Sequence, residues 1–224
     1  MGDFKGFGKE ALPFFKALKF HQSKEWFEAN RALYENDVVA PMAALLDDLT
    51  AAFAKKGPPL KANGKRSIFR LHRDIRFSKD KSPYKTHAGA VMTRSGSKND
   101  PGVLYIHISP EGCFAAAGFH SPEPASLARL RKVAKDDPKR LKSLVARLAK
   151  AGLKFSDYDK LTRLPRGFEE FSEGPLSEII RLKSFIVEEP LLDKLIASPK
   201  LADALIDFAG RAEPLLEFGW DALD

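Results

Sequence analysis

The amino-acid sequence contains little cysteine and no long apolar run. Its one cysteine, Cys113, excludes a disulfide within the chain and is typical of proteins from a reducing compartment. No apolar stretch approaches the roughly 20 residues that a membrane-spanning helix requires. The first residues lack the basic start, long apolar segment and small-residue cleavage site of a secretory signal. We therefore expect a cytoplasmic protein that does not act at a membrane, with Cys113 as a small buried residue.

Common catalytic and cofactor motifs are also missing. The sequence has no glycine-rich phosphate loop, no GxGxxG fingerprint, no GxSxG elbow and no CxxC pair. Four of the five histidines lie in the middle of the chain, at positions 72, 87, 107 and 120, but none has HxxxH or HExxH spacing. Neighbouring cations also oppose a divalent ion. We expect no metal site, and the sequence indicates no particular cofactor.

The spacing of apolar residues changes twice along the chain. The first third has helical spacing, with Ser23 as an N-cap and Pro41 opening or kinking a later segment. The middle third alternates apolar and polar residues, which is typical of half-buried strands. The predicted strands are Phe69–Phe77, Ala88–Thr93, Val103–Ser109 and Phe114–Phe119.

The last third returns to helical spacing. The predicted helices cover Pro124–Lys135 and Pro138–Lys150 and begin again at Leu191 and Lys200, and the stretch RLKSFIV adds a strand. The sequence therefore predicts an α+β fold, with a mostly antiparallel sheet in the middle of the chain packed by N-terminal and C-terminal helices. We expect residues 1–224 to form a single compact domain.

The basic charge of the chain is concentrated in one window. Residues 61–94 contain ten Lys or Arg and two Asp, a charge of +8 that exceeds the +7 of the whole chain. Within the predicted strand 69–77, Arg70, His72, Asp74 and Arg76 share one face, where Asp74 can orient the arginines through bidentate contacts. Arg73 points to the apolar side and therefore needs a sheet edge or an acidic partner.

Two interpretations of this window stay open at the level of the residues. It is either an oriented cationic surface for phosphate or carboxylate groups, or an ion-pair ladder on a solvated strand. Phe69 and Phe77 lie on the apolar face by phase, which favours a place in the core over a role in stacking on bases.

The later strands suggest a polar pocket. Tyr105, His107 and Ser109 alternate with apolar residues on one strand, and the next strand carries the small residues Ala115 to Gly118. Small residues across a sheet face leave room either for a ligand or for a closely packed helix. The cationic strand, the Tyr/His strand and the shallow strand together could therefore line a pocket.

The most specific stretch of the sequence has the form RxxRDxRF followed by DKxxY. Its residues are Arg70, Arg73, Asp74, Arg76, Phe77, Asp80, Lys81 and Tyr84. With EWFEANRALYE, the Gly118–Pro122 region, LPRGF and RLKSF, this motif resembles a bacterial family known as domain of unknown function 2461. The resemblance covers nearly the whole chain and implies an α+β domain around one polar sheet. It implies no activity.

The resemblance adds two candidate ligands, Arg166 and Lys183, which lie in matching elements. The leading hypothesis is a binding site for a phosphorylated or otherwise anionic small molecule, with catalysis left open. Its predicted residues are Arg70, Arg73, Asp74, Arg76, Lys81, Arg166 and Lys183 for the anion, and Tyr84, Lys81 and His107 for proton transfer. The alternatives are a module that binds nucleic acid or another polyanion, and a purely structural ion-pair network.

Overall fold

The protein is built around one four-stranded antiparallel sheet with strand order β1-β2-β3-β4. The computed structural model describes residues 2–224. The N-terminal helices are α1 (Ala11–Phe20), α2 (Lys24–Tyr34) and α3 (Ala40–Phe53), with a π-helical turn at Glu35–Val39 between the last two. The strands are β1 (Ala88–Thr93), β2 (Val103–Ile108), β3 (Cys113–Phe119) and β4 (Phe185–Leu191). The remaining helices are α4 (Pro124–Asp136), α5 (Pro138–Lys150), α6 (Leu176–Arg181), α7 (Asp193–Ile196) and α8 (Lys200–Leu223).

This architecture confirms the predicted α+β class and the antiparallel sheet in the middle of the chain. Local chemistry explains several boundaries. The Ser23 hydroxyl accepts a hydrogen bond from the Trp26 N–H at 3.2 Å, as an N-cap does. Pro41 lies in the first turn of α3, where the preceding π-helical turn accommodates a residue that lacks an N–H.

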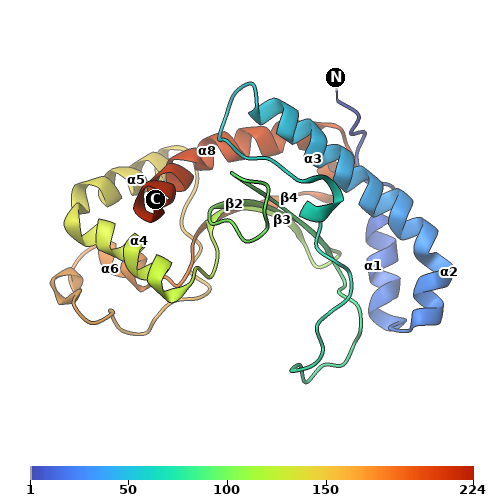
Figure 1. Ribbon diagram of the computed structural model, residues 1–224, viewed down its shortest axis with the longest axis horizontal. Coiled ribbons are helices and arrows are strands. Elements are labelled where there is room, and N and C mark those ends of the chain that lie inside the picture. The colour runs from blue at the N-terminus through green and yellow to red at the C-terminus, as the bar shows by residue number, and fades with distance from the viewer. Residues whose placement is uncertain (1) are drawn as a thin grey trace.

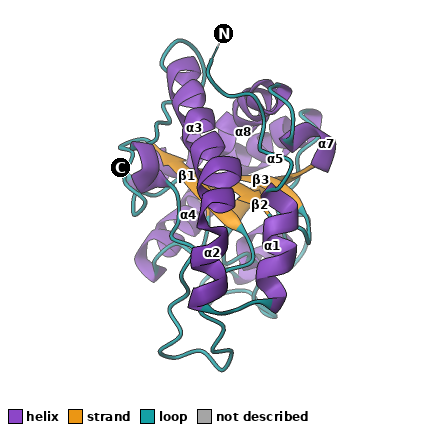
Figure 2. Ribbon diagram, turned by 90° about the vertical axis from the view of Figure 1, so that its right-hand side faces the viewer, coloured by secondary structure: helices purple, strands orange, loops and turns teal. Residues whose placement is uncertain are grey.

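Helices cover only one face of the sheet. Figure 1 shows α3 and α8 lying along one side of the strands, and Figure 2 shows the same layering from the side. In β2, Leu104, Ile106 and Ile108 are fully buried, while the alternating side chains between them are only half-buried. The sheet therefore has a covered apolar face and an open face. Within residues 2–224, no helix combines the length and apolar character needed to cross a bilayer.

Small residues bring α8 close to the middle of the sheet. Ala115 and Ala117 of β3 are fully buried on the covered face, against which α8 packs. Gly219 of α8 faces the ring of Phe119, and a Cβ atom at this position would overlap that ring. The small residues of β3 thus make room for a helix on one face, as one of the two sequence interpretations expected.

The predicted strand Phe69–Phe77 is wrong. The chain there forms an extended excursion, residues 71–85, that hangs away from the sheet in Figure 1. Only single bridges join it, such as His72 opposite Tyr84. Pro83 accepts a hydrogen bond from the Arg73 N–H but has no N–H to donate, so the ladder stops. Phe77, expected in the core, is 93% exposed because no element packs over the excursion tip.

We expect Gly219→Ala to destabilise the protein by about 1–3 kcal/mol, because the added methyl group must displace the Phe119 ring in a packed core. The matched control is Gly210→Ala in the same helix, where nothing lies within 4 Å of the added Cβ. This control should stabilise the protein by up to about 1 kcal/mol through helix propensity. Denaturant unfolding measures both, and a change of the same sign in both variants would contradict the close packing of α8.

Candidate functional site

The open face of the sheet carries its side chains in regular cross-strand rows. One row runs Val91, Tyr105, Ala116 and Glu188, from β1 to β4. The adjacent row runs Gly89, His107, Phe114 and Pro190. Ala116 is the one side chain between Tyr105 and Glu188 in its row. Because it is small, the open face has a hollow at that point.

A cavity of about 700 Å³ lies over this hollow. Its floor includes Tyr105, Phe114 and Ala116, and its walls include Lys85 and Lys98 toward β1 and Glu188 on β4. This volume falls in the range of sites that hold small molecules or cofactors. The cavity thus lies over the Tyr105 strand and the strand of small residues, but none of the predicted arginines lines it, and its charged walls come from residues outside the expected set.

Two lysines share one aromatic ring at the wall of this cavity. The Nζ atoms of Lys85 and Lys98 lie 5.6 and 4.7 Å from the centroid of the Phe69 ring. The Lys98 ammonium also donates to the Ile68 carbonyl oxygen at 2.6 Å. Among the described residues, neither lysine forms an ion pair with a carboxylate. Partial burial lowers the pKa of both ammonium groups, and the nearby Arg70 charge lowers that of Lys85 further.

The rings of Tyr105, Phe114 and His87 line the cavity beside the lysines, and all three contact His107. The Tyr105 hydroxyl and His107 Nδ1 are hydrogen-bonded at 3.0 Å. The His107 ring stacks on Phe114 at 4.6 Å and lies 4.5 Å from the His87 ring, measured between centroids. Burial, with the adjacent His87, lowers the pKa of His107 to about 4. Burial also raises the pKa of Tyr105, so both groups are neutral near pH 7.

The motif arginines are mostly paired within the excursion. Arg76 forms a bidentate contact with Asp74, through Nε at 3.0 Å and Nη2 at 2.7 Å. Arg73 is paired with Asp80, which is the acidic partner that its apolar phase required. Among the described residues Arg70 has no ion pair, although its charge acts on Asp74 and Lys85. Pairs within the excursion thus compensate two of the three arginine charges of the motif.

The other predicted site residues lie apart from the cavity. The Lys81 ammonium donates to the Ile75 carbonyl oxygen at 2.9 Å, which closes the turn of the excursion. Tyr84 is buried against Phe27, with ring centroids 4.9 Å apart. His107 contacts the cavity-lining residues His87, Tyr105 and Phe114 on the open face but does not itself line the cavity.

Arg166 and Lys183 belong to the segment around α6, on the other side of the molecule from the excursion in Figure 1. Lys183 is paired with Asp159 at 2.8 Å, and Arg166 is exposed. Neither residue lines the cavity. The structure therefore does not bring these two cations together with the motif arginines.

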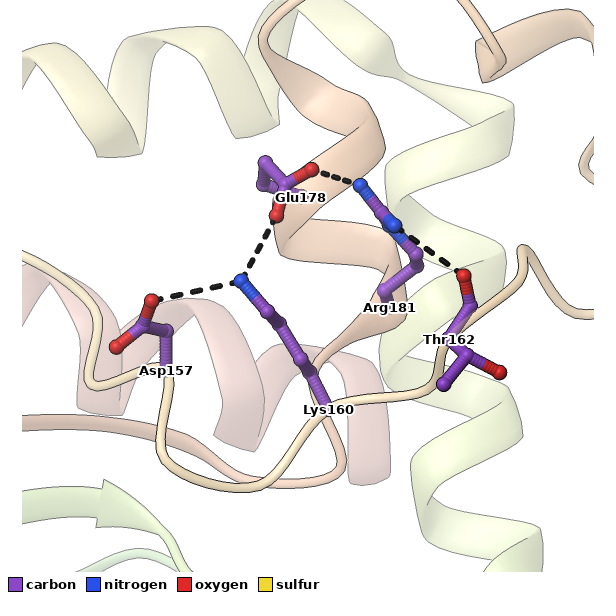
Figure 3. Close-up of polar contacts among 5 residues, drawn as sticks. All are labelled: Asp157, Lys160, Thr162, Glu178 and Arg181. Carbon is purple, nitrogen blue, oxygen red and sulfur yellow. Dashed lines mark hydrogen bonds and ion pairs between the residues drawn. The ribbon is translucent and has the colours of Figure 1, made fainter.

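An ion-pair network holds the segment next to Glu188. Lys160 lies between Asp157, at 3.4 Å, and Glu178, at 3.1 Å (Figure 3). Arg181 contacts the same Glu178 and donates to the Thr162 carbonyl oxygen at 3.4 Å. These contacts fix residues 157–162 to α6 and so place Tyr158 at the wall of the cavity.

Sequence reasoning missed four residues that line the cavity: Lys85, His87, Lys98 and Glu188. Glu188 could have been predicted, because it directly follows the predicted strand RLKSFIV. If that strand continues by one residue, its alternation places Glu188 on the same face as Ile186. Lys98 could not have been predicted in this way, because it lies in a loop whose path over Phe69 depends on the folded sheet. No group of three or more potential metal ligands occurs in the part of the chain that the structure describes.

Fold and site together define an α+β protein with a one-sided antiparallel sheet and a cavity on its open face. Residues 10–218 match the family model described as "Conserved hypothetical protein (DUF2461)", and the chain belongs to this family. This confirms the resemblance found in the sequence. None of the curated proteins and none of the solved structures compared with the chain matches it.

The depressed pKa of His107 predicts a loss of stability in acid. Above pH 6.5 the ring is neutral in both the folded and unfolded chain. Between pH 6.5 and about 4, the unfolded chain binds a proton that the folded protein does not, so this contribution to stability falls as the pH falls. An NMR titration of the imidazole signals tests this, and the His107 signal is assigned as the one that disappears in His107→Gln. We expect this signal to titrate with a midpoint near pH 4, and a midpoint near pH 6.5 would contradict the buried position.

Proposed function

We propose that the protein binds an anionic small molecule, bearing phosphate or carboxylate, in the cavity on the open sheet face. The observation that carries this proposal is that Lys85 and Lys98, at the cavity wall, both lack an acidic partner among the described residues. Partly buried ammonium groups without a carboxylate are costly, and an anion would compensate both. Hydrogen bonds to charged groups contribute about 1.5–3 kcal/mol each.

The same cavity suits a ligand with a flat apolar part. Tyr105 and Phe114 lie on its floor with ring centroids 6.0 Å apart, and the small Ala116 leaves space between Tyr105 and Glu188. Aromatic floors of this kind hold planar groups by stacking and by edge contacts. The ligand class is therefore an aryl or similarly flat molecule that carries an anionic group.

Arg70 extends the proposed cationic wall, since its charge acts on Lys85 and it has no acidic partner among the described residues. Arg73 and Arg76 would have to leave Asp80 and Asp74 to bind an anion. We therefore assign them the role of shaping the excursion. Lys81, Arg166 and Lys183 stay secondary candidates for anion binding. A cytoplasmic location stays a prediction from the sequence.

Proton transfer, if the ligand reacts, falls to the groups nearest the cavity. His87 and Tyr105 line the cavity, and the Tyr105 hydroxyl is hydrogen-bonded to His107. A neutral imidazole near pH 7 can accept a proton, which suits a general base. Tyr84, buried against Phe27, is poorly placed for this role. A measurement of whether the bound ligand is converted to product distinguishes an enzyme from a binding protein.

We expect Lys85→Gln and Lys98→Gln each to weaken the binding of phenyl phosphate about tenfold or more, because each removes one charged contact to the phosphate. The control is Lys55→Gln, which removes an exposed lysine beyond the end of α3, on the helix layer. Isothermal titration calorimetry measures the affinities. Wild-type protein that does not bind phenyl phosphate or an aryl carboxylate, or lysine variants that match the control, would overturn the proposal.

A second candidate function is binding of single-stranded nucleic acid by the excursion tip. The exposed Phe77 ring is flanked by the basic residues Arg76, Lys79 and Lys81, with the Arg76 guanidinium 5.7 Å from the ring centroid. Exposed aromatic rings among cations are typical of surfaces that stack bases. Binding of an oligothymidine, measured by fluorescence anisotropy, should then fall steeply with salt. Phe77→Ala should weaken it by about 1–3 kcal/mol. A flat salt response would remove this candidate.

A further inference from the structure

We infer that the ligand of the cavity is a zwitterion: an aryl or similarly flat molecule with an anionic group at one end and an amine at the other, the amine being held by Glu188. This inference rests on the proposed function and specifies its ligand class. The relevant observation is that one cavity is lined by charges of both signs, with Lys85 and Lys98 beside the Phe69 ring and the carboxylate of Glu188 on β4. Asp100 and Glu123 also line the cavity, and Glu188 is the acid that lies in the same cross-strand row as Tyr105 and Ala116.

Sheet register fixes the separation of the two ends. Tyr105 on β2, Ala116 on β3 and Glu188 on β4 are direct cross-strand neighbours. Since neighbouring strands are about 4.8 Å apart, β2 and β4 are separated by about 10 Å. The lysines lie beyond Tyr105, around the Phe69 ring, which is 6.1 Å from the Tyr105 ring. The cations and the carboxylate form no ion pair with each other, and a ligand that contacts both has to extend across the floor from the Phe69 ring to β4.

The Glu188 carboxylate has no cationic partner. Among the described residues it forms no ion pair, and its one side-chain contact is a hydrogen bond from the Ser156 hydroxyl at 3.2 Å. Lys160, which also lines the adjoining surface, is engaged by Asp157 and Glu178. The next residue, Glu189, makes the contrast clear. It points to the covered face and is paired with Arg211 at 2.5 Å.

The surroundings of Glu188 suit an ammonium group. Tyr158 lines the same end of the cavity, and the Glu188 charge acts on its phenol. A carboxylate beside an aromatic ring binds ammonium through an ion pair and a cation–π contact. Glu188 is exposed and has no cationic partner among the described residues, so its carboxylate is accessible to the ammonium group of a ligand.

The test uses two probes that differ by one group. Phenyl phosphate carries the anion and the ring, and 4-(2-aminoethyl)phenyl phosphate adds an ammonium group on a short chain. Calorimetric titration of the full-length protein should show the aminoethyl compound binding at least tenfold more tightly. Glu188→Gln should abolish this advantage without weakening phenyl phosphate, while Lys85→Gln should weaken both compounds.

The charge-matched control is Glu217→Gln, an exposed glutamate on α8 across the sheet from the cavity. It should leave both affinities unchanged. Equal affinities of the wild type for the two compounds, or an advantage that survives Glu188→Gln, would overturn the zwitterion inference while leaving anion binding intact. Failure of both compounds to bind would overturn the proposed function, and the inference with it.

Discussion

The packing of α8 against β3 is the contact on which the rest of the structure depends. Ala115 and Ala117 let the helix approach the sheet, and Gly219 gives the Phe119 ring its place beneath the helix. Because α3 and α8 both lie on this side, the apolar core forms on one face only (Figure 1). The opposite face keeps half-buried polar side chains, and its middle is hollow where Ala116 lies between Tyr105 and Glu188.

The charge of the central window has two separate roles in this arrangement. Within the excursion, Arg73 and Arg76 are matched by Asp80 and Asp74, so the pairs shape a long exposed loop. Exposed pairs of this kind add little stability individually. Lys85, at the base of the excursion, joins Lys98 over the Phe69 ring without an acidic partner. Lys85, which follows the last motif residue, thus lies at the cavity wall, and the ion pairs of Arg73 and Arg76 stabilise the loop that precedes it.

The sequence allowed prediction of the sheet and of the polar face of β2, because strand alternation alone decides which side chains share a face. It failed over 69–77, where alternation is real but no partner strand exists beyond Pro83, so Phe77 stays exposed. Lys98 reaches the cavity only through the path of its loop over the Phe69 ring, which residue spacing does not encode.

The central claim is that the open sheet face, and not the excursion tip, binds the anionic ligand. Chemical-shift mapping during titration with phenyl phosphate tests it most directly. The account predicts that the largest shifts fall on Lys85, Tyr105 and Ala116, around the cavity. Shifts confined to residues 73–81, or no shifts at all, would contradict it.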